Sequence, residues 1–148
     1  GAVLAQLDDT PTARKLLQVL PCESSASTWG DEVYFEVPVQ TELEEETRQV
    51  VDAGAVCFWV EGASLALPFG PTPISQGDEC RLVSEVNILG MIEGDPQVLG
   101  QVRGGEPIRV ERVEESYSVR FPGCRWDWQR PCGCPGQSTP PGYRIFRL

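Results

Sequence analysis

Apolar and polar positions alternate with a period of two in several short segments of the chain, which is typical of strands with one buried face. The clearest case is Val33, Phe35 and Val37, which alternate with Tyr34 and Glu36. The same reasoning, with turn residues at the boundaries, predicts further strands over residues 2–7, 55–60, 63–69, 85–92 and 108–113. Only Glu61 and Gly62 separate the strand over 55–60 from the strand over 63–69, so these two strands are expected to form a hairpin.

A different period follows Thr10-Pro11, where threonine suits a helix cap and proline the first helical position. Apolar residues then recur at helical spacing, at Ala13, Leu16, Leu17 and Leu20. Pro21 ends this helix, and a second, short helix is expected over residues 96–99. At least six short strands with two helices predict a mostly β protein, and favour a closed barrel over a layered α/β sheet.

The character of the chain changes after residue 113. Proline and glycine accumulate, together with Trp126, Trp128 and the cysteines Cys124, Cys132 and Cys134. Residues 1–113 hold 7 basic and 19 acidic residues, and residues 114–148 hold 5 and 3. We therefore expect a barrel domain over 1–113 and an extension over 114–148 that packs on the barrel or on a second copy. Within the extension, 116–121 and the alternating segment 143–148 are candidate strands.

Charge and hydropathy narrow the functional classes. The net charge of −10 argues against nucleic-acid binding, which needs a basic surface. No apolar run approaches the roughly 20 residues of a membrane helix, and no basic-then-apolar leader opens the sequence. We therefore expect a cytoplasmic protein without a membrane partner. Cys57 lies within an apolar run and is expected in the core.

Six short stretches, in this order along the chain, carry a resemblance to a known family that extends over roughly residues 2–113. They are Asp9-Thr-Pro-Thr-Ala-Arg14, Leu20-Pro21, Thr28-Trp-Gly-Asp-Glu-Val-Tyr-Phe35, Phe69-Gly-Pro-Thr-Pro-Ile-Ser75, Val86-Asn-Ile-Leu-Gly90 and Ile92-Glu-Gly-Asp95. Together they resemble the cyclophilin-like family of mostly bacterial and archaeal proteins of unassigned function. The resemblance implies a closed barrel of about eight strands with one or two short helices. The family is similar in fold to the cyclophilins, which are proline isomerases, but a fold alone does not carry an activity.

The sequence departs from the family pattern in three places. The family usually has one more strand before the segment at Val3, so either the barrel is open here or another segment takes that place. Tyr143–Leu148 is the candidate for that segment. The hairpin turn Val60-Glu61-Gly62 stands where relatives tend to have prolines, so the rim there is expected to differ. The extension after about Val113 has no counterpart in the resemblance.

The available side chains exclude several chemistries. The chain has no histidine, which removes Ser-His-Asp and Cys-His catalysis and histidine metal ligands. It also lacks the glycine-rich phosphate-binding motifs, so no cofactor is expected. The spacing of Cys124, Cys132 and Cys134 does not suit zinc, and a disulfide from Cys124 to either of the others stays open. The acidic run 42–46 lacks the spacing of a calcium loop and is expected to be a solvated loop.

Proline isomerisation needs an apolar pocket and a donor, usually arginine, that stabilises the twisted amide. Cyclophilins with this activity carry a Phe-His-Arg segment, which is absent here. Arg81 or Arg48 would have to supply the donor, and the sequence places neither in a pocket.

The best candidate for a ligand site is a group of polar and aromatic residues near the expected rim of the barrel. Its members are Trp29, Tyr34, Phe69, Thr72, Glu85 and Asn87. Glu85 and Asn87 are two residues apart and so are expected on one face of a strand. The alternative interpretation is structural, with a buried asparagine fastening loops and Trp29-Gly30 filling the core at a turn.

We therefore expect a binding domain for a small polar molecule or a short peptide, without covalent catalysis. A proline isomerase with unusual site residues is the first alternative. The second is a component of a cyclic amide or urea hydrolase, since cyclophilin-like domains occur in allophanate hydrolase and bacterial oxoprolinase. A homodimer that exchanges extensions and a monomer that holds its own are both consistent with the charge distribution.

Overall fold

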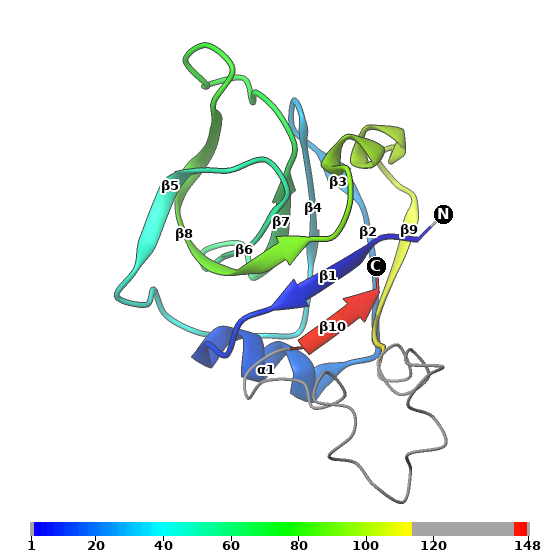
Figure 1. The fold of residues 1–148 in the computed structure, drawn as a ribbon. Coiled ribbons are helices and arrows are strands. Elements are labelled where there is room, and N and C mark those ends of the chain that lie inside the picture. The colour runs from blue at the N-terminus through cyan, green and yellow to red at the C-terminus, as the bar shows by residue number, and fades with distance from the viewer. Residues whose placement is uncertain (1, 114–143, 148) are drawn as a thin grey trace, which may run out of the picture.

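The computed structural model describes residues 2–113 and the backbone of residues 144–147, and Figure 1 shows the arrangement. The elements in chain order are β1 (Leu4–Leu7), α1 (Pro11–Val19), β2 (Cys22–Ser25), β3 (Ser27–Thr28), β4 (Glu32–Glu36), β5 (Thr47–Val51), β6 (Ala55–Trp59), β7 (Ser64–Pro68), β8 (Cys80–Ile92), the 3₁₀ helix η1 (Pro96–Gln101), β9 (Pro107–Arg112) and β10 (Arg144–Arg147). The mostly β class is therefore as predicted. Neither described helix combines the length and the apolar character needed to cross a membrane.

The strands form a single sheet in the order β2-β9-β10-β1-β8-β6-β7-β4-β3, with β5 paired to β8. The two end strands, β2 and β3, are separated in the chain only by Ala26, so the sheet curls strongly. However, β2 pairs with β9 and β3 with β4, and no ladder joins the two ends among the described strands. The prediction of a closed barrel is wrong: the sheet is a curled half-barrel. The physical reason is that the segment changes partner at Ala26, whose N–H donates to the carbonyl of Glu106.

The C-terminal strand β10 lies between β1 and β9 (Figure 1). It is antiparallel to both, with Ala5 opposite Phe146 and Arg112 opposite the same residue on the other side. The segment predicted as a strand at 143–148 is thus a strand over 144–147. It lies next to β1, where the family pattern has an additional strand that this chain lacks. The candidate strand 116–121 and the three cysteines of the extension lie outside the described residues, and the division into two domains stays a prediction.

The main core lies on the inner face of the curled sheet. Val33 and Phe35 of β4, and Leu65 and Leu67 of β7, point into it together with residues of β1, β6, β8 and β9. Helix α1 covers this core through the apolar stripe that the sequence predicts. Its start is fixed as expected, because the hydroxyl of Thr10 accepts a hydrogen bond from the backbone N–H of Ala13.

A second, smaller core lies on the opposite face of β6 and β7. Alternation places Cys57 and Ala66 there, and both are buried. Residues of β5 and of the first half of β8 cover them, including Cys80 and Leu82. Cys57 is therefore buried as predicted, but in this outer cluster. The sequence did not predict β5 or the first half of β8, so it did not predict this layer.

A large irregularity in the β5–β8 ladder shapes the outer layer. Arg48 pairs with Val86 and Val50 pairs with Arg81, so one residue of β5 stands opposite four of β8. The side-chain amide of Gln49 donates to the carbonyl of Leu82 (2.9 Å) and so satisfies a backbone group that the interrupted ladder leaves unpaired. The extra residues of β8, 82–85, arch beside the outer face of the sheet, where they form one wall of a groove.

Candidate functional site

The groove between this arch and the outer face of β4, β6 and β7 is the best candidate site, and we call it the aromatic groove. It has a volume of about 230 Å³. It is lined by Trp29, Glu32, Tyr34, Trp59, Ala66, Leu82, Val83 and Val86. Val83, at its edge, is 53% exposed. The lining is thus largely aromatic and aliphatic, with one carboxylic acid.

Two aromatic side chains form the floor of the groove. Tyr34 and Trp59 contact each other edge to face, with ring centroids 6.3 Å apart and an interplanar angle of 89°. Both point outward because their strand neighbours, Phe35 and Phe58, point into the main core. The hairpin turn makes room for the indole: a Cβ atom on Gly62 would lie 2.3 Å from the ring carbons of Trp59.

Trp29 reaches the groove from the tight turn before β4. Its backbone N–H donates to the carbonyl of Glu32 (3.0 Å), and Gly30 adopts a φ of +61°. A Cβ atom on Gly30 would lie 2.8–3.0 Å from atoms of the loop 71–73. In addition, the N–H of Asp31 donates to the carbonyl of Pro71 (2.9 Å). The turn that carries Trp29 is therefore fixed against this loop, as the sequence suggested for two segments at one rim.

Glu32 is the unusual residue of the groove. It is only 6% exposed, and its Oε1 is buried without a hydrogen-bond partner among residues 2–113. Burial raises the pKa of Glu32 to about 7, because the ionised form loses solvation that nothing replaces. The indole Nε1–H of Trp59 is also buried and has no acceptor in the described part of the chain. Buried polar atoms in proteins are nearly always paired, so two orphans in one small groove need an explanation.

The surroundings of the groove are electronegative. Burial, followed by the charge of Glu32, raises the pKa of the Cys57 thiol. Burial and then the charges of Asp52, Asp31, Asp78 and Glu32 raise the pKa of the Cys80 thiol. No arginine, lysine or histidine is among the eight side chains that line the groove. Arg81, one of the two arginines considered from the sequence, instead pairs with Glu79 (2.6 Å).

The structure brings together two of the six predicted site residues, Trp29 and Tyr34, in the aromatic groove. Phe69 belongs to the main core instead. Thr72 is buried and fastens its loop: its hydroxyl donates to the carbonyl of Arg81, and its N–H donates to Ser75 Oγ (2.9 Å). Glu85 is exposed on β8 and accepts a hydrogen bond from the hydroxyl of Thr47.

Asn87 has the structural role that the sequence left as an alternative. It is fully buried, and its Oδ1 accepts from the backbone N–H of Glu44 (2.8 Å). Its Nδ2 donates to the hydroxyl of Thr12 (3.1 Å) and to the carbonyl of Glu42 (3.0 Å). The hydroxyl of Thr12 donates in turn to the carboxylate of Glu44. The acidic run is therefore a loop, as expected, but Asn87 and Thr12 hold it against the protein, and Glu44 is not simply solvated.

Sequence reasoning missed Glu32 and Trp59. The signal was present, because Glu32 stands two residues before Tyr34 in a strand whose other face is apolar, and residues at this spacing share a face. Trp59 likewise stands two residues after Cys57. However, the outward face of a strand is normally solvated, and only the unpredicted arch of β8 buries this one.

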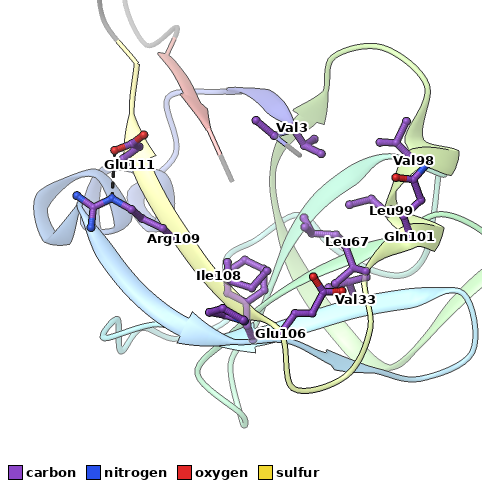
Figure 2. Close-up of a pocket in the computed structure, with 14 residues that line it drawn as sticks. Val3, Val33, Leu67, Val98, Leu99, Gln101, Glu106, Ile108, Arg109 and Glu111 are labelled. Carbon is purple, nitrogen blue, oxygen red and sulfur yellow. Dashed lines mark hydrogen bonds and ion pairs between the residues drawn. The ribbon is translucent and has the colours of Figure 1, made fainter.

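A larger cavity, about 610 Å³, opens between η1, the N-terminal segment and β9 (Figure 2). It reaches the core side chains of Val33 and Leu67, and polar residues such as Glu106 lie at its rim. Arg109 also lies at this rim, where an isomerase would need a free donor beside an apolar pocket. Instead, the Arg109 guanidinium is held by Glu23 (3.0 Å) and Glu111 (3.3 Å).

The comparisons with known proteins agree with this fold. The family model described as cyclophilin-like matches residues 1–111. The chain belongs to the cyclophilin-like family. It is also similar to the solution structure of the hypothetical protein AF2241 from Archaeoglobus fulgidus, with 33% sequence identity and a TM-score of 0.61, over 75% of this chain and 95% of that chain. A search of curated proteins found no match. The comparisons therefore show the family and the fold, and neither of them assigns a ligand or an activity to the aromatic groove.

Proposed function

We propose that this protein is a binding domain that holds a small polar organic molecule, or the end of a short peptide, in the aromatic groove without covalent catalysis. The observation that carries the proposal is that two residues lining an otherwise apolar groove, Glu32 and Trp59, each have a buried polar atom, Oε1 and Nε1–H, without a hydrogen-bond partner among the described residues. Leaving a buried donor or acceptor unpaired costs about 1–3 kcal/mol. A ligand that pairs with these groups would recover this energy on binding.

The shape of the groove fits recognition better than catalysis. Known ligand sites are concave, mostly apolar and contain a few polar groups that orient the ligand. The volume of about 230 Å³ is below the range of roughly 300–1,000 Å³ that is usual for drug-sized ligands, so the occupant is small. The lining contains neither a nucleophile paired with a base nor a pair of carboxylic acids.

The proposal is tested with the full chain, labelled with ¹⁵N at the tryptophan indoles and titrated with a set of small polar fragments. The four tryptophans give four indole signals, which substitution to phenylalanine one at a time assigns. We expect some fragments to shift the indole signals of Trp29 and Trp59 in a saturable way.

A blocked groove provides the control. Val83→Trp places a large ring at the exposed edge of the groove and should abolish these shifts. Val98→Trp makes the same change at another exposed valine, on η1 at the larger cavity, and should leave them unchanged. The proposal fails if no fragment shifts the two signals, or if Val83→Trp binds the same fragments as the natural protein.

A further inference from the structure

We infer that the ligand of the aromatic groove is a small organic cation, an alkylammonium compound that also carries a hydrogen-bond acceptor. This inference rests on the proposed function and specifies the chemistry of the ligand. It follows from three features of the groove: the sign of its charge, the nature of its walls and the two unpaired polar groups.

The charge favours a cation. Glu32 is the only ionisable carboxyl group in the lining, and it has neither an ion pair nor a hydrogen bond among the described residues. The charges of Asp31, Asp52 and Asp78 act on Cys80 in the adjoining cluster and add to the same negative potential. An anionic ligand would meet these charges without a single basic side chain in the lining. A cation would instead supply the counter-charge that Glu32 lacks, in a site where partial exclusion of water strengthens the attraction.

The walls favour an alkylammonium group over a metal ion. Trp29, Tyr34 and Trp59 all line the groove, and aromatic faces attract organic cations through the ring quadrupole. Small hard metal ions need several oxygen ligands, and here one carboxyl group faces aliphatic and aromatic carbon. An alkylated ammonium is only weakly hydrated and has an apolar surface, so it can contact Ala66, Val86 and the rings without losing much solvation.

The second orphan group defines the rest of the ligand. Trp59 lines the groove, and its buried Nε1–H can only donate and has no acceptor among the described residues, so a ligand oxygen such as a hydroxyl or carbonyl would complement it. Choline has the size, the positive charge and the hydroxyl that these features require, and it serves as the probe. Its neutral isostere 3,3-dimethylbutan-1-ol has the same shape and hydroxyl without the charge.

The test compares these two probes by titration calorimetry and by the indole signals of Trp29 and Trp59, at pH 8, where Glu32 is ionised. We expect choline to bind at least about tenfold more tightly than the alcohol, as a partly desolvated cation–π site with a counter-charge implies. Glu32→Gln should remove most of this preference. Trp29→Leu keeps an apolar side chain but removes an aromatic face, so it should weaken choline severalfold more than it weakens the alcohol, measured by calorimetry and by the indole signal of Trp59.

Two outcomes would overturn the inference. If the alcohol binds as tightly as choline, the groove selects apolar shape and the charge plays no part, although the proposed function stands. If neither probe shifts the indole signals while other fragments do, the ligand is not an organic cation, and again only this inference fails. If no fragment of any kind binds, the proposed function fails with it.

Discussion

Replacing Glu32 with glutamine tests the electrostatic description of the groove without any ligand. The carboxyl group has an ordinary pKa of about 4.5, and burial raises the pKa of Glu32 in the folded protein to about 7. Between these values the unfolded chain releases the proton while the folded protein retains it. The contribution of Glu32 to stability is therefore unaffected below pH 4.5, falls as the pH rises towards 7, and is lowest above pH 7.

The magnitude follows from the size of the pKa difference. Each pKa unit corresponds to 1.36 kcal/mol, so ionising Glu32 in the folded protein costs about 3 kcal/mol relative to the unfolded chain. Most of that cost develops between pH 5 and pH 8. Glu32→Gln removes the titrating group. We expect the free energy of unfolding of the variant, relative to the natural protein, to increase by about 2 to 3 kcal/mol from pH 5 to pH 8.

Urea unfolding at several pH values measures this difference, and Glu36→Gln provides a matched control. Glu36 ends the same strand but is exposed, so its substitution should change the free energy of unfolding by less than about 0.5 kcal/mol at either pH. If the Glu32→Gln difference is as flat with pH as that of the control, Glu32 titrates normally and the description of a desolvated, unpartnered carboxyl group is refuted.

Three further predictions follow from the same contacts. Asn87→Ala removes three hydrogen bonds and should lower the free energy of unfolding by about 2–4 kcal/mol, measured in urea. The control Gln6→Ala, at a half-buried residue, removes one solvent-exposed hydrogen bond and should lower it by less than about 0.5 kcal/mol. A loss below about 1 kcal/mol for Asn87→Ala would contradict the role of Asn87. Gly30→Ala should lower the free energy of unfolding more than Gly77→Ala does. Both residues have positive φ, but only at Gly30 would the added Cβ atom meet the backbone of the loop 71–73. Equal losses in thermal or urea unfolding would show that this loop contact is unimportant. The affinity for choline should rise up to about tenfold from pH 6 to pH 8, because Glu32 ionises over this range. The neighbouring thiols of Cys57 and Cys80 have raised pKa values, stay neutral and do not contribute to the change. Equal affinities by calorimetry at the two pH values would rule out Glu32 as the counter-charge.

Much of the fold could be predicted from local patterns. The alternation around Val33 and Phe35 predicted β4, and the cap at Thr10 predicted α1. The alternation of the segment 143–148 predicted a strand, and its place next to β1 was predicted from the strand that the family pattern has there and this chain lacks. What local patterns do not contain is the closure of a sheet, which depends on where an extended segment changes partners, as it does at Ala26.

The site could be predicted only in part, for a related reason. Trp29 and Tyr34 were two of the six polar and aromatic residues predicted near a rim of the sheet, and both line the groove. Asn87 was grouped with them because it is two residues from Glu85, so the amide and the carboxylate were expected side by side on one face of a strand. Its hydrogen bonds to the loop 42–44 decide for the structural role, and these partners are more than 40 residues away in the chain. Glu32 was missed because its burial comes from the arch at residues 82–85, and no local sequence pattern predicts this arch.

The most direct test of the central claim is a crystal structure of the full chain soaked with the fragments that shift the indole signals. The proposal predicts density for one small molecule in the aromatic groove, with a polar atom within hydrogen-bond distance of Glu32 or of Trp59 Nε1. Density for a side chain of this same protein in the groove, paired with Glu32, would contradict it, because the buried carboxyl group would then already have its partner.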